Sequence, residues 1–131
     1  MSVHTDKAYE QELTELRDRL LEMGGLVETA IANSVRAVIE GDPDAAQQVK
    51  TRDRDINRME VDIDGVCRRI LALRQPAASD LRFITTALKI VTDLERMGDL
   101  AVNVAERALE LSHSPAQPTT VAPMHDLAKL A

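Results

Sequence analysis

The sequence predicts an all-α fold, an antiparallel up-down-up three-helix bundle. Aromatic residues make up only 2% of the 131 residues, whereas all-β sandwiches and barrels depend on aromatic and β-branched side chains. Hydrophobic residues make up 44%, which is enough to form a buried core. Along three long segments, apolar residues also recur every three or four positions, which is the period of helices packed against one another.

The first predicted helix runs from near the N-terminus to Gly41. Its apolar positions are Leu13, Leu16, Leu20, Met23, Val27 and Ala30, at helical spacing. Gly24 and Gly25 lie inside it at a cost of roughly 1 kcal/mol each relative to Ala, and they mark either a kink or a close approach of another helix. The N-terminal residues include no apolar stretch of the kind that signal peptides carry, and we expect a cytoplasmic protein.

The second predicted helix follows a break at Gly41, Asp42 and Pro43. Gly41 can take the left-handed conformation that ends a helix, Asp42 can cap the next helix, and Pro43 suits its first turn. The apolar positions that follow are Val49, Ile56, Met59, Ile63, Val66, Ile70 and Leu73. The short break makes this helix an antiparallel neighbour of the first.

The third predicted helix follows a break at residues 75–79. Pro76 disfavours helical geometry at Gln75, and Ser79 is expected to cap the helix. The seam that follows consists of Ile84, Leu88, Val91, Glu95, Gly98, Val102, Ala105 and Leu109. Each helix is therefore about 30 residues, or roughly 45 Å, long.

These breaks give three predicted parts of the chain. Residues 1–113 form the bundle, and residues 114–123, which contain Pro115, Pro118 and Pro123, form a linker. Residues 124–131 begin a further helix, a short C-terminal helical stub.

Acidic and amide side chains form a row on each of the last two predicted helices. The first row is Asp53, Asn57, Glu60 and Asp64, and the second is Glu95, Asp99 and Asn103, with Asp93 nearby. Spacings of three and four residues place each row on one helix face. If Arg74 and Ser79 end the two helices, residue i lies roughly opposite residue 153 − i, so the two rows share the middle third of the bundle.

Two interpretations of these rows remain open. A carboxylate near a core, as Glu95 would be at a seam position, is costly unless another charge compensates it. Arginines such as Arg58, Arg68 and Arg96 could pair with the acids, which would make the rows an ordinary solvated face. Alternatively, a hard cation could bind them, because such ions prefer oxygen ligands.

The sequence excludes or disfavours several function classes. The net charge is −6, which makes nucleic acid a poor partner. Cys67 is the one cysteine; an intramolecular disulfide is impossible, and we interpret it as a buried structural thiol. No zinc motif, phosphate loop or nucleophile elbow is present. The Glu-x-x-His pair, Glu110 and His113, lies at the end of the third helix and not in mid-bundle as in di-iron oxidases. We therefore expect no enzyme.

Four runs of residues resemble the PhoU family of phosphate-signalling regulators. They are MGGLVE at 23–28, MEVDIDGVC at 59–67, LRQPAASDLR at 73–82 and DLERMGD at 93–99. The resemblance extends over roughly residues 5–113, in the family's order and spacing. It implies one three-helix repeat of a family that usually carries two in tandem, and we interpret residues 124–131 as the start of a second repeat.

The resemblance also implies that the chain binds a metal ion. Iron, manganese, zinc and magnesium are the metals reported across the family. The implied ligands are Glu60 with Asp64 and Glu95 with Asp99, and Asp93, Asp53 and Asn103 are additional candidates. It implies a non-enzymatic, cytoplasmic adaptor that represses the phosphate-starvation response. Such an adaptor links the phosphate ABC transporter ATPase to a sensor histidine kinase, and it associates with the membrane only through those partners.

A chain with one repeat is expected to form a homodimer, which would cover the surface a second repeat covers elsewhere. Two alternatives to the adaptor are a helical metal-binding or storage protein and a plain structural dimerisation module.

Overall fold

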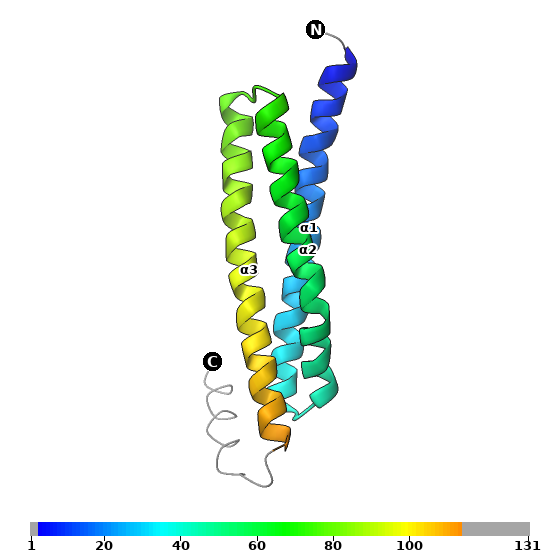
Figure 1. The fold of residues 1–131 in the computed structure, drawn as a ribbon, viewed down its shortest axis with the longest axis vertical. Helices are drawn as coiled ribbons and strands as arrows, with labels where there is room; N and C mark the ends of the chain where they lie inside the picture. Colours follow the sequence, from blue (N-terminus) through cyan, green and yellow to red (C-terminus); the bar gives the residue numbers. More distant parts are fainter. Residues whose placement is uncertain (1–2, 114–131) are drawn as a thin grey trace. The chain divides into compact units, whose positions relative to one another are not determined.

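The computed structural model describes residues 3–113, and this part of the chain is all-helical. Its elements are α1 (Val3–Ile39), α2 (Pro43–Leu73) and α3 (Ala78–His113) (Figure 1). The three helices are those that the hydrophobic period predicts, and the all-α three-helix class is confirmed. The predicted linker at 114–123 and the helical stub at 124–131 lie outside the described residues.

The turn between α1 and α2 forms as its local chemistry predicts. Gly41 has a φ of 63°, a conformation that disfavours residues with a Cβ. The Oδ1 atom of Asp42 accepts hydrogen bonds from the backbone N–H groups of Asp44 at 3.0 Å and Ala45 at 3.3 Å. Asp42 is therefore the N-cap of α2, and Pro43 is the first residue of that helix.

The turn between α2 and α3 differs from the prediction at two residues. The backbone N–H of Leu81 donates to the carbonyl of Ala77 at 2.8 Å, so helical bonding starts two residues before Ser79, which lies inside the first turn and is not the cap. Pro76 restricts only the residue before it, which leaves 77–79 free to be helical. Leu73 is not in the core: it is the last residue of α2, and 68% of its surface is exposed.

The helices pack as two compact units along the chain. The first unit comprises residues 3–27 and 55–96 of the described chain. Its core consists of large aliphatic side chains, the thiol of Cys67 and the methyl group of Ala87; the large side chains are Leu16, Met23, Val27, Ile56, Ile63, Val66, Ile70, Ile84 and Val91. All of these except Cys67 and Ala87 were predicted seam positions.

The second unit comprises residues 28–54 and 97–113. Its buried side chains are small and come from all three helices: Ala30, Ser34, Ala37, Ala45, Ala46, Val49, Ala101, Ala105 and Ala108. The buried hydroxyl of Ser34 donates to the carbonyl of Ile31 at 2.8 Å, which satisfies it within its own helix. Among residues 3–113, no helix has an apolar stretch long enough to cross a membrane.

The paired glycines of α1 are not needed for a close helix approach. A Cβ at Gly24 or Gly25 would meet no atom within 4 Å. Gly25→Ala should therefore raise the free energy of unfolding by about 0.5–1 kcal/mol, because it removes conformational freedom from the unfolded chain without a clash. Urea denaturation measures the change, and Gly41→Ala is the matched control: the same substitution at a φ of 63° should lower stability. Destabilisation by Gly25→Ala would show that something packs against this face.

Candidate functional site

The predicted acidic row on α2 reaches a groove in the first unit. This groove has a volume of about 470 Å³ and is lined by Glu60, Val61 and Asp64 of α2 and by Leu88, Val91 and Thr92 of α3. Glu60 and Asp64 are one helical turn apart and share its wall. Their neighbours on α3 are the residues that the predicted antiparallel register places opposite them, to within one position.

Asp64 has a partner on its own helix. The Nε atom of Arg68 donates to Asp64 Oδ2 at 2.7 Å, and both side chains are well exposed. An exposed i,i+4 pair of this kind contributes about 0.3–0.5 kcal/mol. Arginine pairing, one of the two interpretations of the acidic rows, therefore applies to this carboxylate, although so weak a pair leaves it able to exchange partners.

Glu95 occupies the seam position that the sequence assigns to it. It is half-buried, and its Oε2 atom lies below the surface. Asp93 is exposed and lies two residues earlier, about 200° around the helix. The two carboxylates therefore leave α3 on different faces, and Asp93 is remote from any ligand set built around Glu95.

The remaining predicted ligands belong to the second unit. Asp53 of α2 is half-buried, with a buried Oδ1 atom. Asp99 and Asn103 of α3 are exposed and share a face, since they are four residues apart. The predicted ligands are thus divided: Glu60, Asp64, Asp93 and Glu95 lie in the first unit, and Asp53, Asp99 and Asn103 lie in the second.

The arrangement suits some cations and not others. Among residues 3–113, no three His, Cys, Asp or Glu side chains are grouped so that they could hold a metal ion together. A closed protein cage of the structural-zinc kind needs four ligands. Mg²⁺, by contrast, commonly binds through one or two carboxylates and keeps several waters. The Glu60–Asp64 groove fits that second, water-rich mode of binding.

Cys67 is a buried structural thiol, as predicted. It is fully buried, and burial, together with the nearby charge of Asp64, raises its pKa to about 11. Because the thiolate is the reactive form of cysteine, burial and the raised pKa both argue against a nucleophilic role at neutral pH.

Alkylation of Cys67 should therefore require unfolding of the protein. We expect no modification by iodoacetamide at neutral pH in buffer and complete modification in denaturant, measured by intact mass. Asp64→Asn should lower the thiol pKa only slightly, because burial is the larger cause. Rapid modification of the native protein would mean that this part of the core opens readily.

An ion-pair network that the sequence analysis missed joins α1 to the α2–α3 turn in the first unit. Arg74 donates from Nε at 2.9 Å and from Nη2 at 2.6 Å to Glu12 Oε1. Arg69 Nε lies 3.6 Å from Glu12 Oε2, and the hydroxyl of Tyr9 donates to Asp80 Oδ2 at 2.8 Å. Arg74 and Asp80 belong to the LRQPAASDLR run at 73–82, whose resemblance to the PhoU family could have drawn attention to them. No feature of the sequence around Glu12 indicates that it pairs with Arg74.

Tyr9 should titrate at unusually high pH. Burial, followed by its hydrogen bond to Asp80, raises its pKa to about 12 from 10.0. Because the folded state holds the neutral phenol, this contribution to stability is complete below pH 10 and is lost as the pH rises toward 12. Tyr9 is the one tyrosine in the chain, so tyrosinate absorbance reports it alone. If the absorbance of the folded protein showed a tyrosinate titration midpoint at pH 10.0, the hydrogen bond from Tyr9 to Asp80 would be contradicted.

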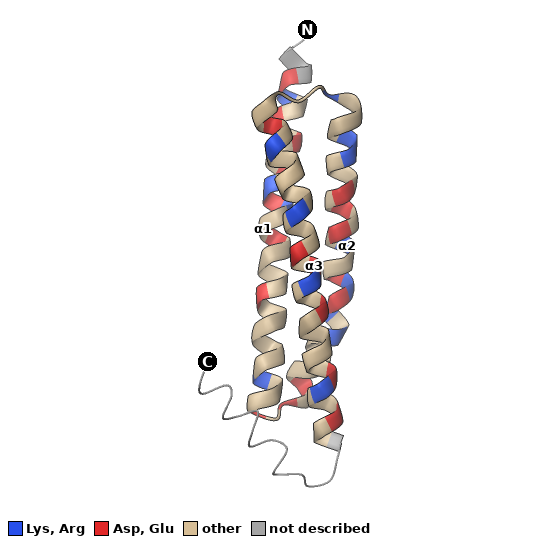
Figure 2. Cartoon of the chain, turned by 90° about the vertical axis from the view of Figure 1, so that its left-hand side faces the viewer, with Lys and Arg blue, Asp and Glu red and all other residues tan. Residues whose placement is uncertain are grey.

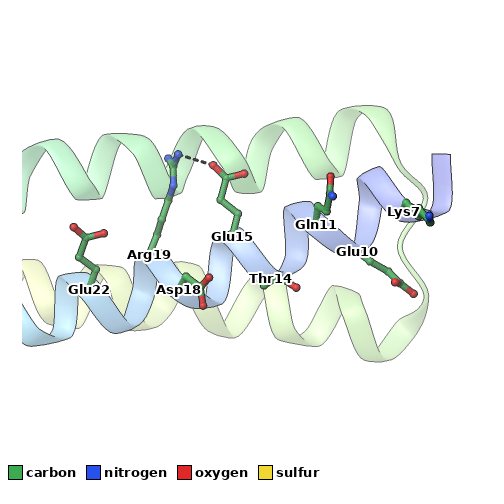
Figure 3. A pocket seen from close by; sticks show the side chains of 8 residues that line it. All are labelled: Lys7, Glu10, Gln11, Thr14, Glu15, Asp18, Arg19 and Glu22. Atoms are coloured by element: carbon green, nitrogen blue, oxygen red, sulfur yellow. Dashed lines mark ion pairs between the residues drawn. The ribbon is translucent and has the colours of Figure 1, made fainter. Parts of the chain in front are cut away.

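The outer face of α1 in the first unit carries many charges. A groove of about 620 Å³ runs along it, lined by Lys7, Glu10, Gln11, Thr14, Glu15, Asp18, Arg19 and Glu22 (Figure 3). Arg19 Nη2 pairs with Glu15 Oε1 at 2.5 Å. All of these side chains come from one helix, so the groove is a solvated helix face and offers no enclosed site.

Comparisons with known proteins agree with the resemblance seen in the sequence. The model of the PhoU domain matches residues 20–108. A Pseudomonas putida relative named "Phosphate-specific transport system accessory protein PhoU homolog" is 50% identical over 115 residues, 88% of this chain and 45% of the relative. The Escherichia coli K12 protein named "Phosphate-specific transport system accessory protein PhoU" is 38% identical over 121 residues, 92% of this chain and 50% of that protein.

A solved structure shows the same fold. The crystal structure of PhoU from Pseudomonas aeruginosa superposes with a TM-score of 0.79 at 48% identity, covering 90% of this chain and 58% of that chain. The chain spans about half the length of the curated relatives it matches. The names of these relatives describe an accessory protein and not an enzyme, in agreement with the prediction from sequence.

Proposed function

Because the chain belongs to the PhoU family, we propose that it is a cytoplasmic accessory protein of the phosphate-specific transport system that represses the phosphate-starvation response when phosphate is plentiful. In this proposal it catalyses no reaction. It acts as an adaptor whose helical surfaces contact the phosphate ABC transporter ATPase and a membrane sensor histidine kinase. The observation that carries the proposal is 50% identity over 88% of this chain to a protein named for that accessory role.

Two accessible surfaces of the first unit support an adaptor role. Both are open grooves lined by charged and apolar side chains, whereas the one thiol is buried. The charged outer face of α1 and the groove between α2 and α3 give a partner two chemically different surfaces.

Deletion of the gene in its host tests the proposal. Phosphate-scavenging genes should be expressed at high phosphate in the deletion strain, and the intact chain supplied from a plasmid should repress them again. Low phosphate is the control condition, because the genes are already active there in every strain. Unchanged expression at high phosphate in the deletion strain would refute the regulatory role.

We further propose that Glu60 and Asp64 bind a hard divalent cation that keeps most of its waters. The cation would compensate the two carboxylates that α2 places in the groove. Support comes from the shared groove and from the oxygen ligands, which suit Mg²⁺ and Mn²⁺. Iron and zinc, which the resemblance also implies, are tested by the same measurement.

Elemental analysis and calorimetric titration of the purified chain test this cation site. Glu60→Gln with Asp64→Asn should abolish binding, whereas Asp55→Asn with Asp62→Asn, two exposed acids of α2, should leave it unchanged. Binding should also fall as the pH drops toward the carboxylate pKa of about 4, because protonated ligands do not coordinate. Equal binding by both double variants would show that the ions are only a diffuse counterion layer.

The same titration separates the two alternative functions. Many ions per chain without a protein partner would favour metal storage over regulation. A chain that binds no metal and affects no phosphate-responsive gene would instead be a structural dimerisation module.

A further inference from the structure

The groove that holds Glu60 and Asp64 continues along the first unit to the α2–α3 turn. Leu71 lies seven residues after Asp64, which lines the groove on α2. Leu81 lies seven residues before Leu88, which lines it on α3. Seven residues are two helical turns, so each leucine stays on the groove side of its helix. Because α2 and α3 are antiparallel, both steps lead toward the turn, and Leu71 and Leu81 lie at nearly the same level.

Apolar side chains are left uncovered along this groove. Leu71 and Leu81 are 41% and 42% exposed, and Leu88 is half-buried. Val61, which lines the groove on α2, is 70% exposed. We call the surface formed by Val61, Leu71, Leu81 and Leu88 the α2–α3 groove. Neighbouring exposed apolar side chains of this size mark an interaction site.

Basic side chains border this groove on both helices. Arg82 and Lys89 each follow a groove leucine by one position, and both are exposed, so they lie on the outer edge of α3. Neither takes part in an ion pair among residues 3–113. On the α2 edge lies Arg68, seven residues after Val61, with 79% of its side chain exposed.

The basic border is a local exception in an acidic chain. The whole chain has a net charge of −6, whereas residues 67–91 contain five basic residues and one acidic residue, Asp80. Asp80 already accepts a hydrogen bond from Tyr9. Figure 2 shows basic positions one above another on the part of α3 nearest the turn. Asp93 lies one helical turn beyond Lys89, so the basic edge is strongest near the turn.

The shape of the open groove fits a helix. Two packed helices border a groove on each of their two sides. On one side of α2 and α3 lies α1, whose Leu16 and Met23 are fully buried in the shared core and whose Glu12 binds Arg74. The α2–α3 groove is the other side, where a further helix would complete a local four-helix arrangement. A lipid bilayer presents a flat surface, which would contact the edges of the groove and leave its floor uncovered.

We propose that the α2–α3 groove binds an amphipathic helix of a partner protein, with an apolar stripe over the groove leucines and an acidic flank along Arg68, Arg82 and Lys89. The inference rests on the adaptor role proposed above and gives the chemistry of the segment that the adaptor recognises. Helices dock in such grooves through apolar anchors spaced three or four residues apart, and opposite charges at the edges set their orientation. Glu60 and Asp64 would repel acidic side chains, so the acidic flank belongs to the end of the partner helix nearest the turn.

The length of the groove sets the expected strength. The rise from Val61 to Leu71 is about 15 Å, or roughly three turns of a bound helix. A contact of this length is small, so we expect a dissociation constant on the order of tens of micromolar. Added salt should weaken the binding, because the basic side chains are exposed and their interactions are screened.

A synthetic helical peptide of about 18 residues tests the groove directly. The peptide carries leucines every three or four positions and glutamates beside the leucines in one half. Fluorescence anisotropy measures its binding to the full chain, and a counterpart with lysine in place of each glutamate is measured alongside. We expect the acidic peptide to bind at least about tenfold more tightly, because only its charges complement the basic edges.

Leu81→Glu tests whether the leucines form the contact. It should weaken binding of the acidic peptide at least about tenfold, because it places a like charge in the apolar contact. Leu21→Glu is the matched control: it is the same change at a leucine of α1 that is 71% exposed, and it should leave the dissociation constant unchanged. Circular dichroism confirms that both variants remain helical.

Charge reversal tests the basic edge separately. Arg82→Glu with Lys89→Glu should weaken the acidic peptide and favour the lysine peptide instead, because it makes the α3 edge acidic. Lys50→Glu with Arg54→Glu changes the net charge equally at exposed positions of α2 in the second unit. This control should keep the preference for the acidic peptide.

Several outcomes would overturn the proposal. It fails if the acidic peptide binds no more tightly than the lysine peptide, or if Leu81→Glu binds it as the wild type does. It fails as well if the chain binds phosphatidylglycerol vesicles through Leu81 and ignores the peptide, which would make the groove a lipid contact. Sedimentation that shows a second copy displaced by the peptide would make the groove a self-association surface instead.

Expression of the variants in the deletion strain separates this inference from the proposed function. Leu81→Glu should fail to restore repression at high phosphate, whereas Leu21→Glu should restore it. If deletion activates the phosphate-scavenging genes and Leu81→Glu represses them fully, the groove is not the docking site and the adaptor role stands. If deletion changes nothing while the peptide binds as expected, the regulatory role fails and the groove stands as a helix-binding site.

Discussion

Ile63→Ala should lower the free energy of unfolding by about 3–4 kcal/mol. Ile63 is fully buried in the first unit, and removing buried methyl groups costs their transfer free energy and that of the cavity left behind. Its neighbours on the buried face of α2 include Ile56, Cys67 and Ile70, which are also almost completely buried. These side chains are anchored on a long helix, so we expect the site to collapse only partly.

Urea denaturation followed by circular dichroism measures this change. Val61→Ala is the matched control, because Val61 lies two residues away on α2 with 70% of its surface exposed. We expect it to cost less than about 0.5 kcal/mol. If Ile63→Ala cost no more than the control, the first unit would lack a fixed core at this level.

The core of the first unit could be predicted from the sequence because its signal is repeated. Met23, Ile63 and Ile84 each lie in a seam of several apolar residues at the same helical period, so no single position had to decide the assignment. The turn at 41–43 was equally predictable, since three consecutive residues each favour the same local geometry. At the other turn Ser79 is a good cap by residue type, yet the helix begins earlier, because helix ends depend on weak preferences that neighbouring residues override.

The placement of Glu60 and Asp64 could be predicted from the sequence, but the partners of their carboxylates could not. The helical period places the two residues on one face, and both line one groove; the α3 side of that groove is Leu88, Val91 and Thr92 and includes none of the acids predicted on α3. Which cation or arginine compensates each carboxylate depends on side-chain rotamers that no spacing specifies. Asp64 thus pairs with Arg68, although Arg58 and Arg96 were candidates of equal standing for the rows.

Contacts between distant residues were the least predictable. Glu12 and Arg74 are 62 residues apart, and their meeting depends on the exact axial position of α1 beside α2. The exposed pair of Leu71 and Leu81 was missed for a different reason. Both lie in helically periodic apolar segments, but such a period does not reveal whether a side chain faces the core of its own unit or another molecule.

Arg74→Ala should lower the free energy of unfolding by about 2–3 kcal/mol, the largest effect we expect outside the core. Only 21% of the Arg74 side chain and 13% of the Glu12 side chain are exposed, so Glu12 would lose two charge-assisted hydrogen bonds in a site that water reaches poorly. Arg69, at 3.6 Å from the other carboxylate oxygen, would compensate only part of the charge. Arg82→Ala, at an exposed arginine beyond the same turn, is the control and should cost less than about 0.5 kcal/mol.

Two further variants show whether the effect belongs to the pair. Arg74→Lys should recover less than half of the loss, because an ammonium group cannot reproduce the two guanidinium bonds that meet at Glu12 Oε1. Combining Arg74→Ala with Glu12→Gln should cost less than the sum of the single changes by about 1–2 kcal/mol, since the second change removes the charge that the first leaves uncompensated. Additive losses would mean that Arg74 stabilises the turn through packing of its aliphatic stem, and that the link to α1 contributes little.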